Sequence, residues 1–450
     1  MKATPRYIYY AYVLLVTLLT IFYIDLWHNG NTVSRLLPVK TITEDGTWCI
    51  DKYQETTIDK ALVNGHYYSE KAPLPALLVT PVYWLLHKAG ITRLMKEDDM
   101  LYLTGSIIIA VIPFIIIVLL IYHYLRRLNW NIYKAMAISL LLPYSTFAWI
   151  YGGTAFSHVM AGMWMILSYI FIRERKQYVA AGLFAGLCFL TEYPTGLLFF
   201  IWPAVLLYQT KKIRNPLLFA AGTFPAIAAQ LIYNAIFTGN PFDMLYNHQA
   251  IDFYNDPNTF IGFALPIPEA MWKLLFGFYR GWFFHAPVLI LFFAFLIKQT
   301  IKTPQKMLTD YLLPLVLVSY LLFSSYRVWY GGWCFGPRHL VPLTLLLIYH
   351  FARYTDLKGI RLTIFNSLAF TGVIYCWMAK STLLYSINAE YKNPLTELIL
   401  PAFSQGSFNE NNLLTLIFSV PPFAAAMVWI TLFFSAIIYL LRKSQSASLN

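Results

Sequence analysis

Apolar residues gather in long runs along this chain, and short polar segments separate the runs. About 20 apolar residues cross a bilayer as a helix, so runs of this kind predict membrane spans. We therefore expect an all-α polytopic membrane protein, a bundle of about 12 transmembrane helices. The expected spans are residues 7–27, 101–125, 135–151, 157–172, 178–191, 194–208, 216–238, 283–298, 309–325, 339–353, 362–379 and 413–441.

The orientation of these spans follows from the basic residues. An even number of helices places both termini on one side, and the short loops of that side then hold more than half of the 33 lysines and arginines. Cytoplasmic loops carry such an excess, so both termini are expected to be cytoplasmic. The run 7–27 lacks a small-residue cleavage site, and we expect it to remain as an anchor helix.

Residues 74–86 form an apolar stretch that this orientation keeps on the outer side. The stretch is shorter than a span and contains Pro75 and Pro81, so we interpret it as a juxtamembrane helix. A true span here, with inverted topology downstream, is the alternative.

Two long outer loops, 28–100 and 239–282, distinguish the outer face from the inner face, where the loops are short. Chemistry is therefore expected on the outer face. The segment 191–194 interrupts the apolar stretch 178–208, and such a break is tolerated where it lines a cavity. No internal repeat or soluble terminal domain is visible, so residues 1–450 are interpreted as one membrane domain.

Composition and charge exclude several classes of function. The chain is 58% hydrophobic and 12% charged, as membrane proteins are. The basic inner loops account for the net charge of +12, so no nucleic-acid partner is needed to explain it. A P-loop is absent from the sequence, which disfavours nucleotide use. A secondary transporter stays an alternative, although its two halves should match and no such match is seen.

Three polar segments of the outer face combine charged and aromatic residues. They are Asp51 to Pro73 with Asp59-Lys60 and the run NGHYYSEKAP (64–73), then FYRGWF (278–283), and then WYGGWCFGPR (329–338). Together these segments resemble the GT-C glycosyltransferases, a superfamily that includes the protein O-mannosyltransferases and the lipid A aminoarabinose transferases. The likeness covers nearly the whole chain.

The resemblance implies a GT-C-type helical bundle in the bacterial inner membrane, with its active site on the periplasmic face. It implies transfer of a monosaccharide from a polyprenyl-phosphate donor to an acceptor, which the sequence leaves unnamed, with inversion at the anomeric carbon. A lipid-linked oligosaccharide ligase or polymerase is an alternative that would use similar groups. Relatives place an acidic residue or pair directly after the first helix, whereas this chain has His28-Asn29-Gly30-Asn31 there and Asp25 just before.

Displacement at an anomeric carbon needs a carboxylate that deprotonates the acceptor. Asp59 and Asp51 are the candidate bases of the first outer loop, and we favour Asp59 because it lies nearer to Lys71 in the sequence. The alternative is that both are ordinary solvated acids, with Asp59 capping a short helix that begins at Lys60.

The departing phosphate needs cations, and three basic residues are candidates for binding it. Lys71 lies in a Glu-Lys element that looks similar to the donor-phosphate element of the family, although a lysine here also suits a contact with lipid headgroups. Arg280 and Arg338 lie at outer helix ends among glycine and aromatic residues, where an uncompensated cation is costly. An anion is therefore expected to face them, and guanidinium donates bidentate hydrogen bonds to phosphate. For each arginine the alternative is contact with lipid headgroups or a structural salt bridge.

Aromatic and polar neighbours of these groups are candidates for binding the substrates. Each also suits a bland interpretation, since tyrosine and tryptophan anchor helices at membrane interfaces. The candidates are His66, Tyr67, Tyr68, Tyr279, Arg327, Tyr330 and Trp333.

Glu192 is an acid within an apolar run, which makes it a functional candidate or a structural partner for an arginine. His158 is a weak candidate metal ligand together with a loop aspartate, for a divalent cation such as Mg²⁺ or Mn²⁺; a packing role is the alternative. Cys49 and Cys334 lie in outer loops and would pair only if those loops meet.

Overall fold

The computed structural model describes residues 5–26, 29–95, 98–251, 262–383, 387–388 and 391–449. It is 74% helical, and the strands of the described part are β1 (Ala61–Val63) and β2 (His66–Tyr68). The expected helical class is therefore confirmed. The expected first span and the two long outer loops include positions outside this part, namely Trp27, His28, residues 96–97 and residues 252–261.

Helices coincide with every apolar segment expected from the sequence. Their bounds are α1 (Arg6–Ile21), α2 (Gly30–Glu44), α3 (Leu74–Lys88), α4 (Asp99–Ser106), α5 (Ile112–Arg127), α6 (Ile132–Tyr144), α7 (His158–Tyr169), α8 (Tyr178–Thr191), α9 (Leu198–Thr210), α10 (Arg214–Thr238), α11 (Pro268–Phe276), α12 (Trp282–His285), α13 (Val288–Lys302), α14 (Pro304–Leu308), α15 (Leu313–Ser324), α16 (Val341–Phe351), α17 (Ile360–Thr382), α18 (Leu400–Ser404), α19 (Leu413–Phe418) and α20 (Pro422–Leu449).

Four helices of the described part are long and apolar enough to cross a membrane: Asp99–Arg127, α10, α17 and Pro422–Ser446 of α20. A fifth is counted if α6 and the short 3-10 segment η4 (Phe147–Gly153) form one bent span. These helices indicate a multi-pass membrane protein. The other expected spans are shorter, broken or less apolar helices, so the number of 12 stays a prediction.

Two expected spans are divided. The helix expected over 135–151 ends at Tyr144, and η4 departs from it at an angle of 86°. α6 ends because Thr146 is extended, with φ −128° and ψ 154°, two residues after Tyr144. The span expected over 413–441 is likewise split, because Ser419 ends α19 in a left-handed conformation and α20 begins at Pro422.

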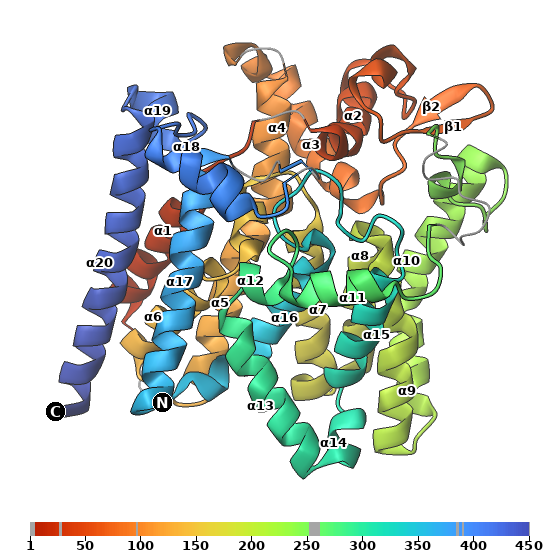
Figure 1. The fold of residues 1–450 in the computed structure, drawn as a ribbon. Coiled ribbons are helices and arrows are strands. Elements are labelled where there is room, and N and C mark those ends of the chain that lie inside the picture. The colour runs from red at the N-terminus through yellow and green to blue at the C-terminus, as the bar shows by residue number, and fades with distance from the viewer. Residues whose placement is uncertain are drawn as a thin grey trace.

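Figure 1 shows the helices as a bundle with most axes running from the top of the view to the bottom. α6, α17 and α20 pack together on one side, while α8, α9 and α10 pack together on the other. The two chain ends are marked at the bottom, and α2, β1, β2, α18 and α19 lie at the top. The first outer loop therefore lies at the end of the bundle opposite the termini.

The first outer loop contains a β-hairpin between two helices. β1 and β2 pair antiparallel, and Asn64 and Gly65 make the turn with φ of 51° and 83°. A two-residue Asn-Gly turn with both φ positive matches the twist of a hairpin. The expected helix over 74–86 is present as α3, which packs against α2. Whether α3 touches the bilayer stays a prediction.

Close packing of α8 against α10 positions the end of α8. A Cβ on Gly182 would lie 1.9 Å from the carbonyl oxygen of Phe219, and one on Gly222 would lie 2.0 Å from that of Val179. Small residues of this kind allow helix backbones to approach in membranes. α8 then ends at Thr191, and Glu192 is extended, with φ −148° and ψ 109°. The expected break is confirmed.

Candidate active site

A cavity of about 710 Å³ opens between the first outer loop, the break after α8 and the loop before α16. Charged side chains from all three regions line it. They are Arg35 of α2, Asp59, Glu70 and Lys71 of the first loop, Glu192 of the break, and Arg338. The second outer loop closes one side with Met244 and Tyr246. A volume of this size suits a small organic ligand.

Lys71 pairs with two carboxylates. Its Nζ lies 2.8 Å from Oδ2 of Asp59 and 2.5 Å from Oε1 of Glu70. The side chains of Lys71 and Asp59 are 14% and 15% exposed, so water screens this pair little. The structure thus brings Asp59 next to Lys71, as expected, and Asp59 precedes β1 rather than a helix at Lys60, which removes its alternative role as a helix cap.

Burial and neighbouring charge set the protonation of this cluster. Burial raises the pKa of Glu70, and the negative charge of Asp59 raises it further against the opposing effect of Lys71. For Asp59, burial also favours the neutral form, but Lys71, Arg338 and Arg35 together hold its pKa below the ordinary value. Burial opposes the charge on Lys71, yet its two carboxylate partners leave the pKa of that ammonium group raised. Asp59 is therefore the more acidic of the two carboxylic acids.

Glu192 holds three elements together. Its Oε1 lies 3.4 Å from Nη2 of Arg35 in α2 and 3.1 Å from Nδ1 of His158 in α7. The hydroxyl of Ser157 donates a hydrogen bond to the same oxygen. The carboxylate at the broken span is thus paired with an arginine, one of the two roles considered for it, while it also lines the cavity.

Arg338 lines the cavity without an acidic partner. Within the described residues, no carboxylate lies within ion-pairing distance of its guanidinium, and its buried Nε has no hydrogen-bond acceptor. The guanidinium lies 5.4 Å from the ring centroid of Phe156. A cation held in this way is suited to receive an anion from the cavity.

Arg280 has a different position from the one expected. It is fully buried and is not among the cavity-lining residues. Its Nε donates to the carbonyl oxygen of Tyr330 over 2.7 Å, and its Nη2 donates to that of Gly332 over 2.9 Å. Its guanidinium also lies 3.5 Å from the ring centroid of Tyr279, whose hydroxyl accepts a hydrogen bond from Nη2. Arg280 therefore braces the loop that carries Arg338, in place of the expected phosphate contact.

The loop braced by Arg280 brings two of the expected aromatic residues to the cavity. Tyr330 and Trp333 both line it, and Trp333 is 59% exposed. Gly331 between them has φ of 76°, and a Cβ there would lie 3.1 Å from Arg338. Arg327 is exposed and lies outside the lining, with its backbone N–H bonded to the carbonyl oxygen of Gly262 over 2.9 Å.

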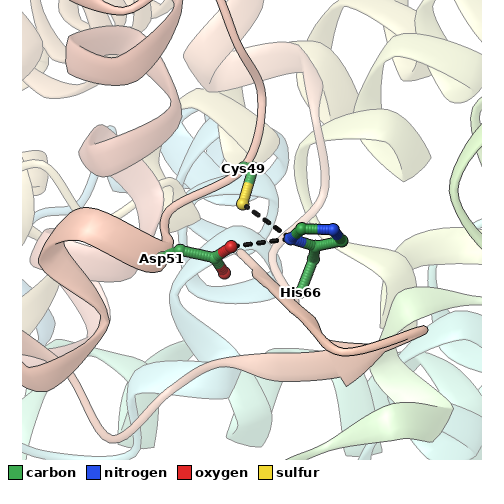
Figure 2. Close-up of side chains that lie close together, drawn as sticks. All are labelled: Cys49, Asp51 and His66. Carbon is green, nitrogen blue, oxygen red and sulfur yellow. Dashed lines mark hydrogen bonds and ion pairs between the residues drawn. The ribbon is translucent and has the colours of Figure 1, made fainter.

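The other candidates of the first loop lie on the hairpin or beside it, and Figure 2 shows two of them, Asp51 and His66. Asp51 Oδ2 lies 2.7 Å from Nδ1 of His66, with side chains 42% and 60% exposed. Tyr68 packs its ring 5.1 Å from that of Phe237, and Tyr67 lies under the ammonium group of Lys60 at 4.8 Å. None of these four candidates lines the cavity.

A metal at His158 would need further ligands close by. His158 pairs with Glu192 rather than with a loop aspartate, and Asp59 pairs with Lys71. Among the described residues, the group of three side chains close enough to hold an ion lies elsewhere, at Cys49, Asp51 and His66. The expected ligand pair at His158 is therefore not formed. All four cysteines are free, so the alternative disulfide between Cys49 and Cys334 is not formed either.

Sequence reasoning missed Arg35. The residue lies within an apolar stretch of an outer segment and is 3% exposed, and its Nε and Nη1 have no hydrogen-bond acceptor among the described residues. The argument that singled out Arg280 and Arg338, an arginine on the outer side beside apolar residues, applies to it equally. Tyr193 was also missed; it follows Glu192 and lines the cavity.

Comparison with solved structures identifies the architecture. ArnT from Cupriavidus metallidurans, solved bound to undecaprenyl phosphate, matches this chain with a TM-score of 0.52 at 13% identity, covering 98% of this chain and 77% of ArnT. The chain has the GT-C fold. The resemblance drawn from the three outer segments is thereby confirmed for the GT-C fold. No protein-family model and no curated protein matches the sequence.

Two archaeal structures are also similar to this chain. They are the oligosaccharyltransferase of Archaeoglobus fulgidus in the apo form, and AglB of the same organism in complex with an inhibitory peptide and a dolichol-phosphate. Their TM-scores are 0.48 and 0.49, each at 13% identity, and the match covers 82% of this chain and 55% of theirs.

Proposed function

We propose that this protein is an inverting glycosyltransferase that moves a monosaccharide from a polyprenyl-phosphate donor to an acceptor. The reaction would occur at the periplasmic face of the bacterial inner membrane, and the excess of basic residues in the expected inner loops supports this orientation. The proposal goes beyond the GT-C fold, because one fold can serve reactions on many different substrates.

The observation that supports this proposal best is that the Arg338 guanidinium lines the cavity without a carboxylate partner among the described residues. The other two cations of the charged cluster in the cavity, Arg35 and Lys71, are paired with carboxylates. Arg338 has no such partner among the described residues. An incoming phosphate would therefore meet a guanidinium that needs no rearrangement, with Lys71 in the same cavity as a second cation.

Asp59 is the base in this proposal. The acceptor oxygen forms a bond to the anomeric carbon while the bond from that carbon to the phosphate oxygen breaks, and the electron pair leaves with the phosphate. Asp59 takes the proton of the acceptor hydroxyl. When a donor phosphate competes for Lys71, Asp59 loses part of the interaction that lowers its pKa, so donor binding would make it a stronger base. Asp51 lies outside the cavity and is the less favoured candidate.

A polyprenyl carrier is supported at the level of fold. ArnT was solved with undecaprenyl phosphate bound, and its match covers 98% of this chain. The cavity also offers apolar surface beside its charges, including Phe263, Leu322 and Phe323. A lipid phosphate suits such a mixture, because its head group needs cations and its chain needs apolar contacts.

The test is release of free polyprenyl phosphate by purified protein. A panel of polyprenyl-phosphate sugars is supplied with a crude membrane extract as the acceptor source, and Asp59→Asn and Asp51→Asn are compared with the exposed control Glu55→Gln. We expect acceptor-dependent release that Asp59→Asn lowers by about 100-fold or more. Full turnover in both aspartate variants would remove both from the role of base.

Arg338 is tested by donor affinity. Arg338→Gln should weaken binding of the polyprenyl-phosphate donor by about 10-fold to 100-fold, since a charge-assisted hydrogen bond contributes about 1.5–3 kcal/mol. Arg93→Gln, an exposed arginine of the same outer region, is the matched control. Unchanged donor affinity in Arg338→Gln would take this arginine out of the phosphate site. Release from a lipid-linked oligosaccharide alone would instead indicate a ligase.

A further inference from the structure

Cys49, Asp51 and His66 form a compact cluster outside the cavity (Figure 2). Their potential ligand atoms all lie within 4.8 Å of one another. Nδ1 of His66 lies 2.7 Å from Oδ2 of Asp51 and 3.9 Å from Sγ of Cys49. The cluster lines a surface depression with Asp45, Thr47, Lys52 and Tyr68. It therefore combines a sulfur, an oxygen and a nitrogen ligand at a place that ions reach from solvent.

We propose that this cluster binds a Zn²⁺ ion through the Cys49 thiolate, one oxygen of Asp51 and Nδ1 of His66. Sulfur and imidazole ligands together favour zinc over magnesium or calcium, which prefer oxygen alone. Water would take the fourth position, since three protein ligands leave a tetrahedral site open. The site is separate from the transfer chemistry and does not depend on it.

The spacing of the three atoms is close to that of a tetrahedral site. Zinc bond lengths of about 2.3 Å to sulfur and about 2.0–2.1 Å to nitrogen and oxygen imply about 3.5 Å between sulfur and a lighter ligand, and about 3.3 Å between two lighter ligands. The observed separations from His66 Nδ1 are 3.9 Å to the sulfur and 2.7 Å to the oxygen. Shifts of about half an ångström, within reach of side-chain rotation, would bring the atoms to these values.

The backbone already orients the ligands. The N–H of Ile50, which lies between Cys49 and Asp51 and is fully buried, donates to the carbonyl oxygen of Tyr67 over 2.9 Å. The N–H of Tyr67 in turn donates to Oδ1 of Asp51 over 2.5 Å, which directs Oδ2 toward His66. Hydrogen bonds of this kind to a ligating carboxylate orient metal ligands. The segment 49–51 and the hairpin are thus joined before any ion binds.

Charge and protonation set the conditions for binding. Thiolate and carboxylate together would neutralise a Zn²⁺ ion, and Lys52, which lines the same depression, is paired with Asp45 at 3.0 Å. Zinc binds the thiolate form of cysteine, so the Cys49 thiol must lose its proton when the ion binds. Binding therefore releases that proton to solvent. The affinity should fall as the pH falls, because protons compete with the ion.

The site would brace the hairpin that leads to the cavity. His66 is at the tip of the hairpin, whereas Asp59 precedes β1 and Lys71 follows β2. An ion that ties this tip to segment 49–51 would reduce motion of the chain between the two cavity residues. A structural zinc ion contributes folding free energy directly.

The test uses tag-free, full-length protein in detergent, freed of metal by a chelator and titrated with Co²⁺ and Zn²⁺. Co²⁺ bound to a thiolate gives a charge-transfer absorption band, which reports the sulfur ligand in the native protein without any substitution. We expect one ion per chain, this band with Co²⁺, and its loss when Zn²⁺ displaces Co²⁺. A rise in melting temperature with Zn²⁺ should accompany binding.

Variants then assign the ligands. Cys49→Ser should abolish the band and weaken Zn²⁺ binding by more than about 100-fold. Loss of a residue that only hydrogen-bonds to a ligand weakens metal binding by at most about 100-fold. His66→Gln should weaken binding similarly and serves if Cys49→Ser is poorly folded. The matched control is His248→Gln, which breaks another histidine–aspartate pair, partly exposed and with Asp243 at 2.7 Å, that lacks a thiol. Absence of the band in the native protein, or unchanged Zn²⁺ affinity in Cys49→Ser, would overturn the proposal.

Discussion

Two pairs of an acid with a base lie at opposite ends of one hairpin. At its base, Lys71 and Asp59 are 2.8 Å apart and 14% and 15% exposed. At its tip, His66 and Asp51 are 2.7 Å apart and 60% and 42% exposed. The distances are nearly equal, so burial is what separates the pairs. An exposed pair contributes about 0–1 kcal/mol, whereas removing one partner of a buried pair costs about 3–5 kcal/mol.

The largest effect is expected at the base of the hairpin. Lys71→Met leaves Asp59 and Glu70 buried without their shared cation, so we expect a loss of about 3–5 kcal/mol in the free energy of unfolding. Thermal unfolding in detergent measures it. The control is Lys52→Met, which breaks the exposed pair with Asp45 and should leave the unfolding temperature unchanged. Equal losses in the two variants would show that burial does not distinguish these pairs.

A smaller effect, dependent on pH, is expected at Glu70. Its raised pKa means that the folded protein holds the proton of this acid more tightly than the unfolded chain does. The resulting stability is fully present below the ordinary pKa of about 4.3 and is lost as the pH rises through the folded pKa. Asp59, with its lowered pKa, behaves in the opposite way: its contribution is present above about 3.9 and is lost as the pH falls through the folded pKa.

Glu70→Gln separates these two contributions. Glutamine is neutral at every pH, so the variant should gain stability relative to the native protein as the pH rises, while the contribution of Asp59 is retained in both. Melting temperatures at steps from about pH 4 to pH 8 check this. A difference between the two proteins that does not change with pH would contradict a raised pKa at Glu70.

The smallest effect is expected at the tip of the hairpin. Asp51→Asn in metal-free protein should change the free energy of unfolding by about 0–1 kcal/mol, because water screens the exposed pair with His66. Chemical unfolding followed by tryptophan fluorescence measures this. In protein loaded with Zn²⁺ the same substitution should cost more, since it also removes a proposed ligand. A loss of several kcal/mol in the free energy of unfolding of the metal-free protein would contradict this, because it would show that the pair at the tip behaves like a buried pair.

The arginines show how far sequence reasoning reaches. Arg280 and Arg338 were selected by one argument, that a cation on the outer side beside apolar residues needs a partner. The outcome differs between the two: backbone carbonyl oxygens rather than an anion face Arg280, while Arg338 faces the cavity. Loop conformation decides between these outcomes, and it depends on the positive φ of Gly331 and Gly332, which no spacing in the sequence reports.

The acids of the first loop teach a similar lesson. Asp59 was favoured over Asp51 because it lies nearer to Lys71 along the chain, and the cavity does contain Asp59 and not Asp51. The hairpin explains this, since its turn at Asn64 and Gly65 brings the segments before and after it together. The pairing of Arg35 with Glu192 joins residues 157 positions apart, and such a contact is a product of tertiary packing.

The helices were easier to predict than the way they cross the membrane. Each expected apolar run marked the position of a helix, because burial and lipid both select apolar residues. They did not mark the sharp bend between α6 and η4, or the division between α19 and α20. The extended Thr146 and the left-handed Ser419 end those helices, while the apolar character of the sequence continues.

The way in which Arg280 holds the loop before α16 leaves the side chains at the cavity entrance free to vary. Its hydrogen bonds to the loop reach the carbonyl oxygens of Tyr330 and Gly332, which every amino acid provides. The side chain of Trp333, 59% exposed at the cavity, takes no part in this attachment. Mutational drift or deliberate engineering at position 333 can therefore reshape the entrance while the backbone that carries Arg338 stays in place.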